Sequence, residues 1–218
     1  MSNSSPIFIS FHTPDGNYLN LSKKLKKSLD KFDLRSHIVQ INHKFRNWQE
    51  GTFYKSNFIL QSLLKFRTFV VWLDIDTEVW QYPKLLFNDH DFAIYNWLAD
   101  KDHHLQGRIP FDPQTKSLKC SGGVQKYGYT APSINLLLAW IDVLKQHPNS
   151  QTEDDPYLDI AFNKGNFELD TLWLPKTYNR MDKHTSHWSD IPKDLVVINH
   201  DYVGGNHRII NKNEKKGF

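Results

Sequence analysis

The stretch that decides the fold is Phe69–Thr77, which reads FVVWLDIDT. Its first five residues, 69–73, are all apolar, and such a run is typical of a strand buried on both faces at the centre of a sheet. Asp74 and Asp76 follow at once, so two carboxylates stand at the end of this strand. Ligands of open α/β sheets bind beyond the carboxyl ends of the strands. The stretch therefore predicts a central strand and a functional site directly after it.

Strand and helix patterns alternate on both sides of this stretch. Apolar runs predict further strands at residues 7–11, 37–41, 92–97, 169–174 and 195–198. Apolar residues at helical spacing predict helices at residues 18–32, 56–66, 133–144 and 155–162. Side chains suited to cap the last three of these helices are those of Ser56, Ser133 and Asp155. This alternation predicts an α/β fold with a mostly parallel central sheet flanked by helices.

Length and composition predict one globular domain. The chain has 218 residues, of which 39% are hydrophobic and 23% charged, a balance unlike that of disordered proteins. We expect a single domain over residues 1–218, with flexible ends at 1–5 and 211–218 and a long polar loop at 99–119. Whether this domain belongs to a larger protein stays open.

Charge and cysteine content exclude several classes of protein. Lys and Arg number 27 and Asp and Glu 24, and the net charge of +3 argues against a dedicated binder of nucleic acid or of anionic membranes. The single cysteine, Cys120, excludes a disulfide framework and Cys-x-x-Cys metal motifs. No stretch reaches the roughly 18 apolar residues of a membrane-spanning helix, and no signal-peptide pattern opens the sequence. We therefore expect a cytoplasmic protein with no transmembrane segment.

The two aspartates after the central strand form a candidate metal site. If the chain stays extended there, Asp74 and Asp76 project to the same side, because side chains of a strand alternate. Converging carboxylates repel each other unless a cation joins them, and such ligands suit Mn²⁺ or Mg²⁺, which can hold a diphosphate. The same spacing recurs at residues 89–91 and 100–102, but only the first copy follows a buried strand. The alternative is a solvated strand end without a metal.

The end of the last predicted strand offers a third ligand. His200 stands just beyond it, and Gly204, Gly205 and Arg208 follow. By itself, His200 is more typical of a hydrogen-bonded turn residue than of a ligand, but the two aspartates favour a metal role. Glycines permit close approach of the backbone to a phosphate, and an arginine can pair with phosphate charge. We expect Gly204, Gly205 and Arg208 to contribute to binding of a diphosphate.

Four segments in this order resemble the core of the GT-A glycosyltransferases that use nucleotide-diphosphate sugars. They are KSNFIL at Lys55–Leu60, VVWLDID at Val70–Asp76, SGGV at Ser121–Val124 and INH at Ile198–His200. The resemblance extends from about residue 6 to residue 208 and is closest to small glycosyltransferase domains of the chlorella-virus kind. It implies a single GT-A, Rossmann-like domain and a hexosyltransferase-like enzyme. The cofactor would be Mn²⁺ or Mg²⁺, the donor a UDP-sugar and the acceptor a glycan or other hydroxyl, with retention of configuration. A viral chain would work in the host cytoplasm.

The resemblance also implies roles for individual residues. It places Asp74, Asp76 and His200 on the metal, with Asp74 also at the donor. The residues that it places around the rest of the donor are Thr13, Tyr18, Lys55, Ser121, Gly122 and Gly123. Other interpretations remain: Tyr18 also begins an apolar helix stripe, Lys55 resembles a solvated charge ahead of a helix, and the two glycines resemble a turn.

The catalytic carboxylate implied by the resemblance has three candidates. Glu153, Asp154 and Asp155 all lie just before a predicted helix, where related enzymes place an acidic or amide residue. Because Asp155 suits a helix N-cap, Glu153 and Asp154 are freer to act on a substrate. The sequence does not choose among the three.

Two rival functions fit parts of the sequence. A haloacid-dehalogenase-type phosphatase also has aspartates after an apolar strand, but its Asp-x-Asp-x-Thr motif is out of register here, because Thr77 comes one residue early. A non-catalytic carbohydrate-binding domain would explain the 7 Trp, 9 Tyr and 14 Phe. Of these rings, Tyr18, Trp97 and Tyr127 are expected near loops, where they could stack on a base or sugar. We expect other rings to lie in the core, namely Phe58, Trp72 and Trp140.

Overall fold

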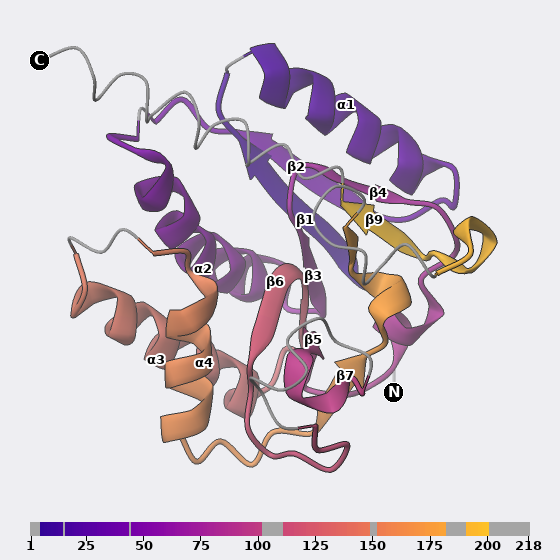
Figure 1. Ribbon diagram of the computed structural model, residues 1–218. Coiled ribbons are helices and arrows are strands. Elements are labelled where there is room, and N and C mark those ends of the chain that lie inside the picture. The colour runs from indigo at the N-terminus through magenta and orange to yellow at the C-terminus, as the bar shows by residue number, and fades with distance from the viewer. Residues whose placement is uncertain are drawn as a thin grey trace, which may run out of the picture.

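The computed structural model describes residues 5–14, 16–43, 45–101, 111–148, 152–181 and 191–200. Its centre is a six-stranded sheet with the strand order β2-β1-β3-β6-β5-β7 (Figure 1). The strands are β1 (Ile7–His12), β2 (Ser36–Gln40), β3 (Val70–Leu73), β5 (Phe92–Asn96), β6 (Cys120–Tyr127) and β7 (Thr171–Leu174). All run in one direction except β6, which is antiparallel to both neighbours. The predicted α/β fold with a mostly parallel sheet is confirmed.

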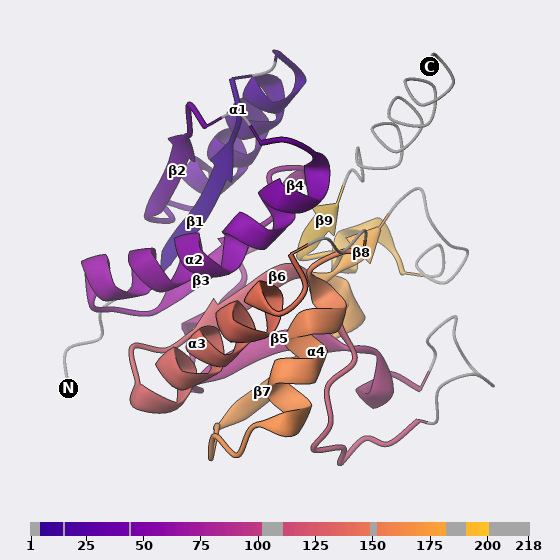
Figure 2. The same cartoon turned by 90° about the vertical axis from the view of Figure 1, so that its left-hand side faces the viewer.

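Helices cover both faces of this sheet. They are α1 (Gly16–Asp30), α2 (Trp48–Phe66), α3 (Ala131–Lys145) and α4 (Asp155–Lys164), with short 3-10 turns at Lys84–Phe87, Trp97–Ala99, Lys176–Tyr178 and Lys193–Leu195. Figure 2 shows α2, α3 and α4 on one face, while α1 lies on the other. A small sheet, ordered β4-β9-β8, lies beside α1 (Figure 1). Its strands are β4 (Thr77–Val79), β8 (Arg180–Met181) and β9 (Ile198–His200).

Strand β3 is buried on both faces, as its apolar run predicts. Val70 and Trp72 pack into the core under α2, α3 and α4, whereas Val71 and Leu73 pack into the core under α1. The strand pairs with β1 on one side and with β6 on the other. It therefore directs the residues that follow it to the middle of the sheet edge.

Helix α2 begins earlier than the sequence predicted. Its N-cap is Asn47, whose side chain accepts a hydrogen bond from the Glu50 amide at 2.9 Å, and Ser56 lies in the helix interior. The additional turns pack Phe53 and Tyr54 against the core. This burial explains why the helix extends past the predicted cap.

The predicted cap of α3 was also wrong. Thr130 is the N-cap, and its side chain accepts from the Ser133 amide. Ser133 is buried and its hydroxyl donates to the Asp91 carbonyl at 2.6 Å. Ser133 therefore joins α3 to the start of β5 instead of capping the N-terminus of the helix.

None of the helices in the described part of the chain is long and apolar enough to cross a membrane.

Candidate functional site

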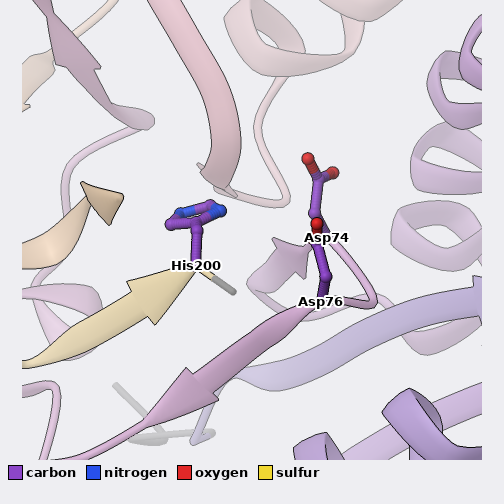
Figure 3. Close-up of side chains that lie close together, drawn as sticks. All are labelled: Asp74, Asp76 and His200. Atoms are coloured by element: carbon purple, nitrogen blue, oxygen red, sulfur yellow. The ribbon is translucent and has the colours of Figure 1, made fainter. Parts of the chain in front are cut away.

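The two aspartates after β3 lie on a tight turn. The Asp74 carbonyl accepts from the Thr77 amide at 3.1 Å and from the Thr77 hydroxyl at 2.8 Å. The chain does not stay extended here, the condition under which alternation would place both side chains on one side, because these bonds bend it between β3 and β4. Asp74 and Asp76 nevertheless lie close together (Figure 3).

Strand pairing brings His200 to this turn. Strand β9 runs antiparallel to β4, with Thr77 opposite His200. One ligand atom from each of Asp74, Asp76 and His200 lies within 4.8 Å of the other two. Figure 3 shows the two carboxylates on the turn and the imidazole at the end of β9. The structure thus brings together the three residues predicted as metal ligands.

His200 lies in a state suited to metal binding. The ring is buried, and among the residues that the structure describes its Nε2 has no hydrogen-bond partner. Burial lowers the pKa of His200 to about 4, so the imidazole is neutral at pH 7 and retains a lone pair. An unpaired buried nitrogen is unfavourable, and a cation between it and two carboxylates would satisfy it. The donor set of two carboxylates and one imidazole fits Mn²⁺, and also Mg²⁺.

Gly123 lies directly under the His200 ring. A Cβ atom at Gly123 would lie 1.9 Å from His200 Cε1, far inside any real contact. The Gly123 carbonyl also accepts from the Asp74 amide at 2.9 Å. Strand β6 can therefore pass beneath the metal-binding side chains only because this residue has no side chain.

Replacing Gly123 with alanine is expected to displace His200 and to lower Mn²⁺ affinity by about tenfold or more. The reason is the steric overlap of the new methyl group with the imidazole. Calorimetric titration with Mn²⁺ measures the effect. Gly51→Ala is the matched control. The nearest atom that a Cβ at Gly51 would meet is a ring atom of Phe45, at 3.3 Å. Equal Mn²⁺ affinity in the wild type and the Gly123 variant would contradict this account of the site.

Lys55 joins the turn after β3 to the start of α4. Its Nζ lies 2.9 Å from Asp154 Oδ2 and 3.3 Å from Asp74 Oδ1, and its side chain is only 6% exposed. The alternative of a solvated charge ahead of a helix is therefore wrong. Burial lowers the pKa of Lys55, but the charges of Asp154 and Asp74 outweigh this effect and raise it overall. Lys55 is a permanent cation at this site.

Trp72 and Gln125 support the site and were not predicted to do so. Trp72 Nε1 donates to Asp74 Oδ1 at 2.7 Å, and Gln125 Nε2 donates to the Gly122 carbonyl at 2.8 Å. Gln125 Oε1 accepts from the Tyr127 hydroxyl at 2.8 Å. For Gln125, the available signal was a polar side chain within a segment that folds as a buried strand, because such a side chain requires a hydrogen-bond partner.

Asp154 and Asp155 occupy the start of α4. Asp154 is buried at the N-cap position, but its side chain makes no cap bond and pairs with Lys55. The prediction that Asp155 caps α4 was wrong, because Asp155 Oδ2 accepts from the Gly122 amide at 3.0 Å. Burial and the neighbouring Asp154 raise the pKa of Asp155 to about 7. The third candidate, Glu153, is half-buried just before them.

The other predicted donor residues lie in several places. Thr13 follows β1 and Tyr18 is in the first turn of α1, both half-buried, and β1 and β3 end at the same edge of the sheet. Ser121 is buried in β6. Three further predicted residues lie outside the described part of the chain, namely Gly204, Gly205 and Arg208.

Two of the rings expected at the site are in the core instead. Tyr127 is fully buried, and Trp97 is buried with its Nε1 donating to the Cys120 carbonyl at 3.1 Å. Neither ring can stack on a base or sugar in this structure. The expectation was wrong because Tyr127 belongs to the buried strand β6 and Trp97 directly follows the buried strand β5.

Comparisons with known proteins place this fold. No protein-family model and no curated protein matches the chain. Among solved structures, it is similar to a glycosyltransferase involved in glycosylation of the major capsid of PBCV-1. The TM-score is 0.64 and the identity 12%, over 95% of this chain and 100% of that one.

Two further solved structures are similar. One is the galactosyltransferase LgtC in complex with donor and acceptor sugar analogues, with a TM-score of 0.51 and 13% identity over 90% of this chain and 86% of that one. The other is the glycosyltransferase GlyE of Streptococcus pneumoniae, with a TM-score of 0.53 and 16% identity over 90% of this chain and 54% of that one. Because the identities are so low, these similarities establish the GT-A fold and nothing beyond the fold.

Proposed function

We propose that this protein is a metal-dependent glycosyltransferase that transfers a sugar from a UDP-sugar to a hydroxyl of a glycan or related acceptor. The observation that carries the proposal is the cluster of Asp74, Asp76 and His200 at the carboxyl end of β3. The fold adds support, since it is shared with glycosyltransferases, one of them described with donor and acceptor sugar analogues.

The three ligands would hold Mn²⁺ or Mg²⁺, which supplies Lewis-acid stabilisation of a departing diphosphate. Transfer breaks the bond between the anomeric carbon and the diphosphate and forms a bond from that carbon to the acceptor oxygen. The nucleotide diphosphate leaves with the bonding electrons and takes up the proton of the acceptor hydroxyl. Lys55 stays protonated and is held between Asp74 and Asp154, so it fixes the orientation of both carboxylates. Thr13 and Tyr18, at the same edge of the sheet, would contact the nucleoside.

Asp155 is the residue that we place beside the reacting sugar. Its carboxylate bonds the amide of Gly122, in the segment Ser121–Gly123 that would face the donor sugar. Asp154 forms an ion pair with Lys55 and balances its positive charge. A carboxylate beside the anomeric carbon stabilises the positive charge that develops there, which fits transfer with retention.

A donor screen with and without Mn²⁺ tests the proposal. We expect slow hydrolysis of one UDP-sugar, measured as nucleotide release, to fall to background with EDTA and to return with added Mn²⁺. The reason is that the leaving diphosphate needs a cation held by three protein ligands. Analysis of the product's anomeric configuration tests retention, and an inverted product would contradict it.

The same screen separates the rivals. Hydrolysis of a simple phosphomonoester without activity on any UDP-sugar would favour the phosphatase. Glycan binding that survives Asp76→Ala, with no donor ever consumed, would favour a non-catalytic binding domain. Activity that EDTA leaves unchanged would contradict the metal role.

A further inference from the structure

Strand β6 extends past the end of β3, and in the described part of the chain no strand pairs with that portion of its edge. The β3 pairing ends where Leu73 lies opposite Val124, and the Asp74 amide adds one bond to Gly123. Just before β6, the Lys119 carbonyl accepts from the amide of Trp97, which directly follows β5, and so faces that side. Because backbone groups alternate between the two sides of a strand, the neighbouring amides face away from β5.

Side chains of α4 occupy the place of the missing strand. Figure 2 shows α4 beside β6. The amides of Gly122, Cys120 and Leu118 donate to side chains of this helix at 3.0, 2.8 and 2.7 Å. The acceptors, in the same order, are Asp155 Oδ2, Asp159 Oδ1 and Asn163 Oδ1. We call this set of three bonds the α4 ladder and each bond a rung, numbered from Gly122 to Leu118.

The spacing of the α4 ladder follows from element geometry. Its helix members are four residues apart, which is about 6 Å along a helix. Its other members are Leu118, just before β6, and Cys120 and Gly122 in β6, and they are two residues apart, which is about 6.6 Å along an extended chain. The near-equality of these distances lets three successive rungs form between α4 and the extended segment 118–122. The rungs run in opposite directions along the two elements, so Asn163 reaches Leu118 while Asp155 reaches Gly122.

Two rungs carry additional bonds. Asn163 Nδ2 donates back to the Leu118 carbonyl at 2.9 Å, and Lys119 Nζ lies 3.1 Å from Asp159 Oδ2. Asp159 is buried, whereas the Lys119 side chain is 43% exposed. The bond to the Cys120 amide is therefore the buried contact of Asp159, and the lysine pair is its solvated one.

We propose that Asp159 and Asn163 are positioning residues for the sugar transfer, a role that rests on the proposed function. Neither bonds the metal cluster in the described part of the chain; both act through the first rung. By holding β6 against α4, they fix Asp155 relative to Gly122 and Gly123, and so relative to His200 above Gly123. The carboxylate beside the reacting sugar and the metal-binding imidazole are thereby held in one register.

Kinetics of Asp159→Ala test this role. We expect kcat to fall by about tenfold with the donor KM changed less than about twofold, because a lost buried hydrogen bond misplaces the reacting carboxylate without removing donor contacts. Asp159→Asn keeps an acceptor for the Cys120 amide and should retain most of kcat. Lys119→Ala, which removes only the solvated pair, is the matched control and should behave as the wild type.

Labelling of Cys120 tests the α4 ladder without any activity. Cys120 is the only cysteine of the 218 residues, and it is buried beneath the second rung. We expect Asp159→Ala and Asn163→Ala to accelerate reaction of this thiol with a disulfide reagent by about tenfold, since α4 opens more readily from β6. Asp142→Ala, which breaks an exposed ion pair on α3, should leave the labelling rate unchanged.

Asn163→Ala guards against a folding defect, because it lies at the rung farthest from Asp155. A folded variant with faster labelling and lower kcat supports the proposal. An active wild type with unchanged kcat in both alanine variants overturns it. A wild type that consumes no donor overturns the proposed function instead, and the labelling rates show that outcome to be separate from any failure of the ladder.

Discussion

Replacing Asp76 with asparagine is expected to lower UDP-sugar turnover by about a thousandfold while the protein stays folded. The substitution keeps the size of the side chain but removes one of the two negative charges that would hold the cation. Loss of a cation that stabilises a leaving diphosphate costs several kcal/mol in the transition state, and about 4 kcal/mol corresponds to this factor. Nucleotide release at saturating Mn²⁺ measures turnover, and calorimetry measures the accompanying loss of Mn²⁺ affinity.

Asp142→Asn is the control for charge alone. Asp142 is exposed on α3, and its ion pair with Lys145 is solvated, so its variant should keep full activity. Circular dichroism establishes that both variants are folded. Turnover by the Asp76 variant within about threefold of the wild type would contradict the metal-dependent mechanism.

Replacing Lys55 with methionine is expected to destabilise the protein by about 3–5 kcal/mol at neutral pH, the usual cost of removing one partner from a buried ion pair. The substitution leaves Asp154 buried without its cation. Urea unfolding measures the loss. Lys145→Met is the matched control, because that lysine is 71% exposed, and its free energy of unfolding should change by less than about 0.5 kcal/mol.

The loss in the Lys55 variant should depend on pH. Burial raises the pKa of Asp154, and removal of Lys55 should raise it further, since the charge of Lys55 is the largest effect that opposes burial. A carboxyl group whose pKa is raised by folding loses stabilising effect as pH increases. The variant should therefore be destabilised more at pH 8 than at pH 5. Adding Asp154→Asn should restore part of the stability, and losses that simply add would contradict the pairing.

Much of the fold was predictable because it depends on local apolar patterns. Val70–Leu73 is buried on both faces, and an unbroken apolar run indicates this without further information. The interiors of the helices followed from their spacing, but their starts did not. Helix α2 begins after Asn47 because the earlier start packs Phe53 against the core. That long-range contact could not be predicted from the capping side chain of Ser56.

Strand β6 was not predicted, because polar residues and glycines interrupt its apolar ones although the whole strand is buried. Gln125 and Lys126 are fully buried, and each is satisfied by a partner far away in the sequence or on a neighbouring backbone group. Lys126 Nζ, for example, lies 2.6 Å from Asn88 Oδ1. A pattern based on hydrophobicity alone takes such residues for a surface loop.

The candidate site was predictable in its ligands and not in its supports. Asp74 directly follows β3 of the central sheet, and His200 is the last residue of β9 in the small sheet, so both ligands lie at strand ends, as the sequence predicted. The contact of Lys55 with Asp154 joins two segments about 100 residues apart, and nothing local to either indicates the pairing. The bond from Gly122 to Asp155 likewise arises only when α4 lies against β6.

The pairing of β4 with β9 has a consequence for assembly of the protein. It brings His200 to Asp76 across about 120 residues of sequence, so the last described strand must dock before the three ligands can meet. Closing such a long loop is entropically costly, and a cation held by both ends would act as a reversible cross-link across it. Cation binding would then slow the release of β9. The metal centre that we assign to catalysis would therefore also hold β9, the last described strand, in its place.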